Sequence, residues 1–261
     1  MTAIALDDVT IVLGGRPVVD GIELDVERGE WLALIGPNGG GKTTLLRAIA
    51  GLVPFAGSIA LEERLTQAMH RRELSRLLAV VPQEPSTPPW MTVGEYVLLG
   101  RTPHLGPLAK EGVRDREAAA RALTRLDLVD YRERLLGTLS GGEKQRVVVA
   151  RALAQEAPII LLDEPTAALD IGHQQQALEL IDVLRVESGL TLVSAMHDLT
   201  LAAQYADRMV LLDRGRVVAD GAPRDVLTEE AIARHYGASI DVVPVNGRIA
   251  VVPRRSSSRD T

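Results

Sequence analysis

The sequence has no cysteine, few aromatic residues and no long apolar run. The absence of cysteine from all 261 residues excludes disulfides and thiolate metal sites. One Phe, two Trp and four Tyr leave few side chains that could stack on nucleic-acid bases. No run approaches ~18 apolar residues, so we expect no membrane-spanning helix. The first residues also lack the pattern of a secretory signal.

The composition is otherwise that of an ordinary globular protein with an acidic excess. Hydrophobic residues make up 46% of the chain and charged residues 25%, and this length can bury a substantial core. The formal net charge is −6, which argues against a primary nucleic-acid binder. We therefore expect no nucleic-acid partner.

A glycine-rich segment at residues 36–44 fits the phosphate-binding pattern G-x-x-x-x-G-K-[ST]. Glycines let backbone N–H groups approach an anion closely, lysine adds a positive charge, and a hydroxyl can bind Mg²⁺. An apolar run at 31–35 precedes the segment and a helix-forming stretch at 45–50 follows it, so the loop should lie at a helix N-terminus, which favours anions. Alone, this loop is compatible with a kinase, a GTPase or an ATPase. The candidate nucleotide-binding residues are Gly36, Pro37, Asn38, Gly39, Gly40, Gly41, Lys42, Thr43 and Thr44.

The pattern of apolar residues around this loop predicts an α/β fold. Residues 3–30 alternate apolar and polar side chains around Gly14-Gly15, which indicates an antiparallel β region before the strand at 31–35. A proline-rich connector at 84–89 opens a mainly helical stretch. Further strands are expected at 57–61, 77–81, 158–162, 190–195, 209–212 and 216–219, and helices at 45–50, 93–99, 110–126, 143–155, 173–187, 199–205 and 228–236. Alternation continues to 252, and the serine-rich residues 254–261 are expected to be disordered.

Two acidic residues directly follow the apolar strand near residue 160. Asp163 at the strand end could hold Mg²⁺ opposite the phosphate loop. Glu164 should lie on the other side of the strand end, where it could polarise an attacking water as general base. Many strands end in acidic residues for solubility, so the pair gains its functional meaning from the phosphate loop upstream.

A third motif is the string Leu-Ser-Gly-Gly-Glu-Lys-Gln-Arg at residues 139–146. Ser140, Gly141 and Gly142 open a helix and offer a hydroxyl and free N–H groups to an anion, without a lysine. A serine and two glycines alone would indicate an ordinary helix cap. The full string resembles the signature of ABC transporter ATP-binding subunits, and this resemblance extends over nearly all of residues 3–236.

The resemblance implies a P-loop NTPase core with an antiparallel β subdomain and a helical insert. It implies an ATPase domain at 1–236, a helical subdomain at about 84–140 and a C-terminal extension at 237–261. It also implies a dimer, formed with a second copy or a paralogous subunit, in which Ser140–Gly142 of one chain face the ATP of the other.

The family's residue roles map onto matching positions of this sequence. Residues 36–44 resemble the Walker A loop, and residues 167–170 resemble the D-loop, in which Asp170 is expected near the dimer interface. The implied catalytic residues are Glu164, His197 and Gln83, and the implied Mg²⁺ ligands are Thr43, Gln83 and Asp163. Taken alone, Gln83 would be a surface amide in a turn, and His197 would be a capping or surface residue.

The position that contacts adenine departs from the family pattern. The family commonly has an aromatic residue in the first β region, whereas this sequence has Val-Leu-Gly-Gly-Arg at 12–16. Leu13 lies near the expected position. We therefore expect an aliphatic adenine contact through Leu13, or a contact from Arg16 nearby.

Two strings resemble the subfamily of iron-siderophore, haem and vitamin B12 importers. They are Gly-Arg-Thr-Pro-His at 100–104 and His-Asp-Leu-Thr-Leu-Ala-Ala-Gln-Tyr-Ala-Asp at 197–207. Alternatively, Arg101 and His104 are solvated loop residues. The resemblance implies separate permease subunits, an indirect link to a substrate-binding protein, and a peripheral location on the cytoplasmic face of a bacterial membrane. Two alternatives are a transporter ATPase for another cargo and a soluble ABC ATPase acting on nucleic acid or ribosomes, which the acidic charge and short insert disfavour.

Overall fold

The computed structural model describes residues 1–106, 109–167, 169–245 and 247–254. Its centre is a six-stranded sheet in the order β10-β9-β3-β8-β7-β6, with five parallel strands and β10 antiparallel at one edge. The strands are β3 (Trp31–Ile35), β6 (Leu78–Val81), β7 (Ile159–Asp163), β8 (Thr191–Ala195), β9 (Arg208–Asp213) and β10 (Arg216–Gly221). Every residue of β3, β7 and β8 is buried, as expected for a parallel sheet covered on both faces.

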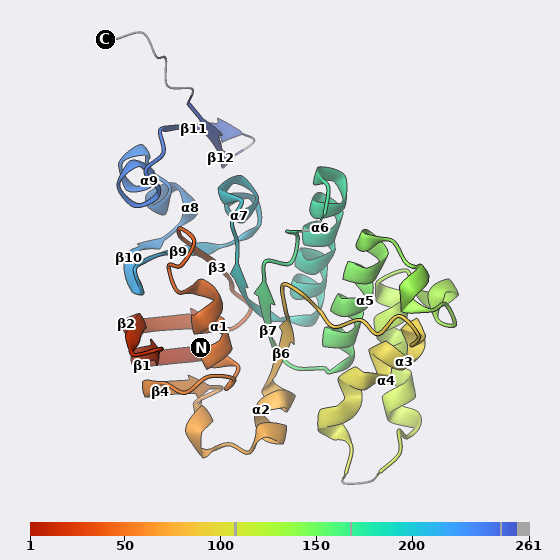
Figure 1. Cartoon of the computed structure of the whole chain (residues 1–261). Helices are drawn as coiled ribbons and strands as arrows, with labels where there is room; N and C mark the ends of the chain where they lie inside the picture. Colours follow the sequence, from red (N-terminus) through yellow and green to blue (C-terminus); the bar gives the residue numbers. More distant parts are fainter. Residues whose placement is uncertain (107–108, 168, 246, 255–261) are drawn as a thin grey trace.

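A smaller antiparallel sheet flanks the core, and the alternation in the first 30 residues predicts two of its strands, β1 and β2 (Figure 1). Its order is β2-β1-β4-β5. The strands are β1 (Thr2–Leu13), β2 (Arg16–Glu27), β4 (Ala56–Leu61) and β5 (Arg64–Leu65). Inward-facing apolar side chains of β1 and β2 join the buried Leu32 and Leu34 of β3 in one core, so this sheet and helix α1 (Lys42–Ile49) cover one face of the central sheet.

The alternate residues of β3 point into a second core on the other face. Ala33 and Ile35 pack there with residues from the helices that follow β6 and β7. These helices are α3 (Val93–Leu98), α4 (Val113–Arg125), α5 (Gly141–Ala154) and α6 (Ile171–Ser188). Helix α7 (Leu199–Tyr205), which follows β8, packs in the same core. Helix α2 (Arg71–Leu77) precedes β6, and its Leu74 packs in the first core. Helices α3 and α4 lie between β6 and α5, where the sequence predicts the helical insert, and its proposed domain boundaries stay a prediction.

Arg101 and His104 of the importer-like string are not solvated loop residues. The Arg101 residue is only 5% exposed, and its guanidinium bonds Asp115 (3.1 Å), Glu156 (2.8 Å) and the Ala154 carbonyl (2.7 Å). His104 Nε2 lies 2.8 Å from the Gln155 carbonyl oxygen. A buried guanidinium needs such partners. These contacts join the string to the C-terminal end of α5.

The C-terminal part contains more regular structure than the sequence predicts. The elements are α8 (Pro223–Val226), α9 (Glu229–Tyr236), β11 (Ile240–Val245) and β12 (Arg248–Pro253), of which α8 is not predicted. Arg254 pairs with Asp241, and its N–H donates to the Ser239 carbonyl at 2.9 Å. The other residues of the tail expected to be disordered, 255–261, lie outside the described residues. Within the described ranges, no helix has the length and apolar character to cross a membrane.

Candidate active site

The glycine-rich loop joins the end of β3 to the start of α1 and rests against the end of β9. A methyl group added at Gly36 would lie 2.0 Å from the Leu212 carbonyl oxygen, and one at Gly40 would lie 2.8 Å from the same atom. At Gly41, whose φ is +104°, it would lie 2.8 Å from the Val18 carbonyl oxygen. The loop can pack this closely only because these residues have no side chain.

Lys42 and the loop backbone form the positive side of the site. The Lys42 ammonium donates to the carbonyls of Gly36 (2.7 Å) and Pro37 (3.1 Å). Burial lowers the pKa of Lys42, and the nearby Glu164 and Asp163 carboxylates oppose this shift. Asn38 and Gly39 complete the turn, which the hydrogen bond from Gly40 N–H to the Pro37 carbonyl closes at 3.0 Å. The first turn of α1 carries Thr43 and Thr44, so the arrangement fits a phosphate chain at a helix N-terminus.

A hydroxyl and a carboxylate meet between α1 and β7. Thr43 Oγ1 donates to Asp163 Oδ1 at 2.8 Å, and Asp163 is 7% exposed. Gln83 and Asp163 line one pocket of about 290 Å³. Among the described residues, no group of three or more His, Cys, Asp or Glu side chains could hold a metal by itself. Oxygen donors that leave room for phosphate and water ligands fit Mg²⁺.

Glu164 lies at the junction of three segments far apart in the sequence. Its Oε2 accepts a hydrogen bond from Gln83 Nε2 at 2.7 Å, and its Oε1 contacts His197 Nε2. Its φ of +49° is unusual for a residue with a side chain. That turn, in which Glu164 N–H donates to the Ala195 carbonyl at 3.0 Å, directs the Glu164 carboxylate to His197 while Asp163 bonds Thr43. Two consecutive acids thus have different partners, as the sequence predicts.

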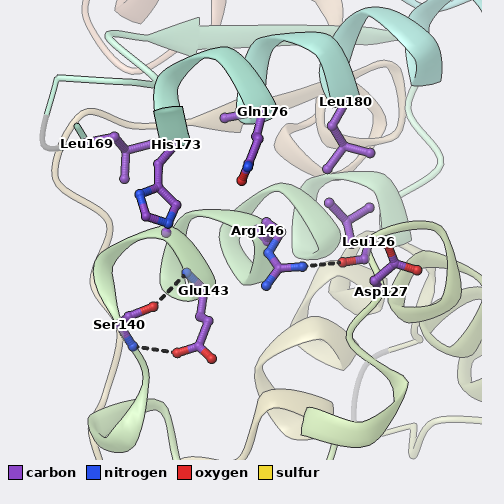
Figure 2. Close-up of a pocket in the computed structure, with 11 residues that line it drawn as sticks. Leu126, Asp127, Ser140, Glu143, Arg146, Leu169, His173, Gln176 and Leu180 are labelled. Carbon is purple, nitrogen blue, oxygen red and sulfur yellow. Dashed lines mark hydrogen bonds between the residues drawn. The ribbon is translucent and has the colours of Figure 1, made fainter. Parts of the chain in front are cut away.

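The Ser-Gly-Gly turn begins α5 in a different pocket, which Figure 2 shows. Ser140 Oγ accepts from Glu143 N–H at 3.3 Å, and Glu143 Oε2 accepts from Ser140 N–H at 2.6 Å, a reciprocal cap. The pocket has a volume of about 330 Å³. Its lining residues are Leu126, Asp127, Ser140, Gly142, Glu143, Arg146, Leu169, His173, Gln176, Ala177 and Leu180. No residue of the phosphate loop is in this lining, so one chain does not bring the two motifs together there.

Asp170 and the proposed adenine contacts lie at the edges of these sites. Asp170 caps α6 and accepts from His173 N–H at 2.9 Å, while Ala168 of the proposed D-loop lies outside the described residues. Leu13 and Arg16 face each other across the β1–β2 turn, and Leu13 is 42% exposed. Because β2 continues to Val18, which touches Gly41, this turn lies beside the phosphate loop.

Sequence reasoning missed the groups behind the phosphate loop. They are the Leu212 carbonyl, the turn at Gly215, whose N–H donates to the Gly40 carbonyl at 3.1 Å, and Tyr236 of α9, whose buried hydroxyl lies near the Gly36 backbone without a hydrogen bond of good geometry. The first two are backbone contacts and carry no residue-type signal. The Tyr236 side chain shows no recognisable spacing from the loop.

A phosphate loop, a Thr–Asp pair and a general-base candidate on a mostly parallel sheet define a P-loop nucleotide-hydrolysing protein. The chain belongs to the ABC transporter family, because the family model described as "ABC transporter" matches residues 19–167. As a member of this family it is an ATP-binding subunit with ATPase activity.

Two curated relatives resemble the chain over most of its length. The hemin import ATP-binding protein of Rhodococcus jostii is 43% identical, and the match covers 95% of this chain and 85% of that protein. The ferric enterobactin transport ATP-binding protein of Escherichia coli is 38% identical, with 95% and 92% covered.

Two solved structures share the fold. An inward-facing ABC transporter of metal-chelate type has a TM-score of 0.85 at 28% identity and covers 98% of this chain and 99% of that chain. A dimeric ATP-binding cassette in a post-hydrolysis state with ADP and Pi has a TM-score of 0.73 at 30% identity, with 85% and 99% covered.

Proposed function

We propose that the chain hydrolyses MgATP in a head-to-tail dimer and that this powers import of a metal chelate through separate permease subunits. The observation that carries the chemistry is the convergence of Gln83 and His197 on Glu164, next to the Thr43–Asp163 pair. Bound MgATP would supply a γ-phosphoryl group whose developing charge the cation neutralises.

Each residue then has a defined task. The loop amides and Lys42 hold the phosphates, and Thr43, Asp163 and Gln83 hold Mg²⁺. Glu164 polarises the attacking water as general base, while His197 orients the Glu164 carboxylate and contacts the terminal phosphate. Leu13 or Arg16 contacts adenine.

The signature turn completes the site from a second chain. Ser140, Gly141 and Gly142 form a helix N-terminus that suits phosphate, yet their pocket contains no residue of the chain's own phosphate loop. A two-fold dimer resolves this separation, because each signature turn then faces the partner's loop and Asp170 lies near the interface. The dimeric cassette among the similar structures supports this arrangement.

The two relatives are named for hemin import and for ferric enterobactin transport. The similar transporter structure is of metal-chelate type, which supports a metal chelate as the cargo. We assign the chain to the cytoplasmic face of a bacterial membrane, bound to permease subunits that receive an iron-siderophore, haem or cobalamin-type chelate from a substrate-binding protein.

A mixing experiment tests the composite site. Lys42→Ala disables the phosphate loop, and Ser140→Arg blocks the signature turn, so each variant alone should not hydrolyse ATP. In an equal mixture, about half of the dimers are mixed, and one of the two sites in each mixed dimer has both parts intact. Activity should therefore return to roughly a quarter of the wild-type level. A site formed within one chain would give no recovery.

The cargo is tested by growth of a strain from which the gene is deleted. We expect loss of growth when hemin, a ferric siderophore or cobalamin is the required nutrient, and recovery with the wild-type gene but not with Glu164→Gln. Unimpaired use of all three nutrients would exclude metal-chelate import.

A further inference from the structure

The C-terminal helix α9 is bonded to the strand that supports the phosphate loop. His235 Nδ1 lies 2.9 Å from Asp213 Oδ2, and both side chains are largely buried, at 16% and 21% exposure. Asp213 directly follows Leu212, whose carbonyl oxygen touches Gly36 and Gly40. The pair therefore fixes α9 to the part of β9 against which the loop rests.

Tyr236 extends from the same helix to the loop itself. Its ring packs against the main core, and its hydroxyl is buried with no hydrogen-bond partner of good geometry among the described residues. Burial raises the pKa of this phenol, and the backbone amide of Gly36 lowers it in part. A buried hydroxyl without a full partner is costly, so its position against the phosphate-loop backbone calls for a functional explanation.

The β11–β12 hairpin that follows α9 is hydrogen-bonded to α7, the helix after His197. Thr200 Oγ1 donates to the Val251 carbonyl at 3.2 Å and accepts from Val251 N–H at 3.0 Å. Gln204 Nε2 donates to the Ile249 carbonyl at 3.1 Å. Helix α7 begins two residues after His197, and Figure 1 shows α9, β11 and β12 together beside α7 and β9.

We propose that helix α9 and the strands β11 and β12 form a brace that positions both parts of the phosphate site. It holds the loop at Gly36 through Tyr236 and His235, and the His197 segment through Thr200. Tyr236 is a positioning residue, and its hydroxyl gains a hydrogen bond to the loop backbone when MgATP binds. This inference rests on the proposed role of the loop in binding ATP. It assigns a role to α9 and to the hairpin in the C-terminal extension, neither of which the ATP-binding motifs include.

Tyr236→Phe in the full chain is the decisive test, because it removes only the hydroxyl. Loss of an unsatisfied buried hydroxyl should leave the melting temperature unchanged or raise it. The dissociation constant for MgATP, measured by calorimetry, should rise roughly two- to tenfold, the effect of one hydrogen bond. His235→Leu should weaken binding similarly, and His235→Asn, which can still donate to Asp213, should restore it. Substitution of the exposed Arg234 by alanine is the matched control on α9.

The second arm concerns the His197 segment. Thr200→Val should lower kcat with little change in MgATP affinity, because it loosens α7 rather than the loop. Thr124→Val is its control, since the only partner of the Thr124 hydroxyl among the described residues is the Ala120 carbonyl of its own helix, at 3.0 Å.

Two results would overturn the brace. One is wild-type MgATP affinity in Tyr236→Phe, and the other is equal kcat in Thr200→Val and Thr124→Val. Lys42→Ala separates this failure from a failure of the proposed function. If Lys42→Ala still binds MgATP, the assignment of the loop as the phosphate site is wrong. If Lys42→Ala loses MgATP binding while Tyr236→Phe binds like the wild type, only the brace is rejected.

Discussion

Gly36→Ala should separate the phosphate loop from β9. The added methyl carbon would lie 2.0 Å from the Leu212 carbonyl oxygen, and real methyl carbons essentially never approach a non-bonded atom closer than 3.0 Å. Loop and strand must therefore move apart by about 1 Å in a region packed without voids. A misplacement of about 1 Å can reduce catalysis roughly a hundredfold, so kcat/KM for ATP should fall by about that factor.

Gly189→Ala is the matched control for backbone strain. Gly189 ends α6 with φ +63°, and nothing lies within 4 Å of an added methyl group. This variant bears only the left-handed backbone cost of about 1–2 kcal/mol, which should lower the melting temperature by about 2–8 °C. Its kcat/KM should stay at the wild-type value. Wild-type kcat/KM in Gly36→Ala would refute the close packing of the loop on β9.

Three further predictions concern other contacts. Thr43→Val should abolish the gain in ATP affinity that Mg²⁺ gives, because it removes the hydroxyl that bonds Asp163, while Thr43→Ser should retain this gain. Calorimetry with Mg²⁺ or EDTA measures the gain in each variant. An equal gain in the two variants would contradict the metal assignment. Arg101→Met should lower the free energy of unfolding in urea by about 2–3 kcal/mol, since its partners lose charged hydrogen bonds; an unchanged midpoint would show that the buried cluster contributes nothing. Hydrogen bonds from Ser140, the backbone one foremost, hold the pKa of Glu143 below its ordinary value of 4.5. The contribution of the Glu143 carboxylate to stability is therefore complete above pH 4.5 and is lost as the pH falls through the lower folded-state pKa. Glu143→Gln should flatten the plot of melting temperature against pH in this range. Parallel plots for the variant and the wild type would argue against the cap.

Much of the central fold can be predicted because its signals are local. The apolar run at 31–35 and the one ending at Asp163 become strands buried on both faces, and alternation in the first 30 residues becomes the antiparallel sheet. Helix α8 has only four residues, which is too short for a periodic pattern. The burial of Arg101 depends on Asp115 and Glu156, which lie far along the chain and are ordinary acidic residues in sequence.

The candidate site also has features that the sequence predicts and features that it does not. Thr43 with Asp163, and Glu164 with His197, are motif residues, and the structure gives each pair a direct contact. The positive φ of Glu164 and the support of Gly36 by Leu212 come from backbone geometry, which no residue pattern encodes. The proposed dimeric character of the site rests on the family resemblance and on the dimeric cassette among the similar structures. It cannot be seen in one chain, whose signature-turn pocket is lined by no residue of its own phosphate loop.

The central claim is that Glu164 is the general base of a site closed by a second chain. Glu164→Gln keeps the shape of the side chain but removes the charge that polarises water, and exposed Glu187→Gln on α6 is its control. With MgATP, light scattering after size-exclusion chromatography should show Glu164→Gln as a stable ATP-bound dimer without turnover. Normal turnover by this variant, or a monomer that binds MgATP, would contradict the account.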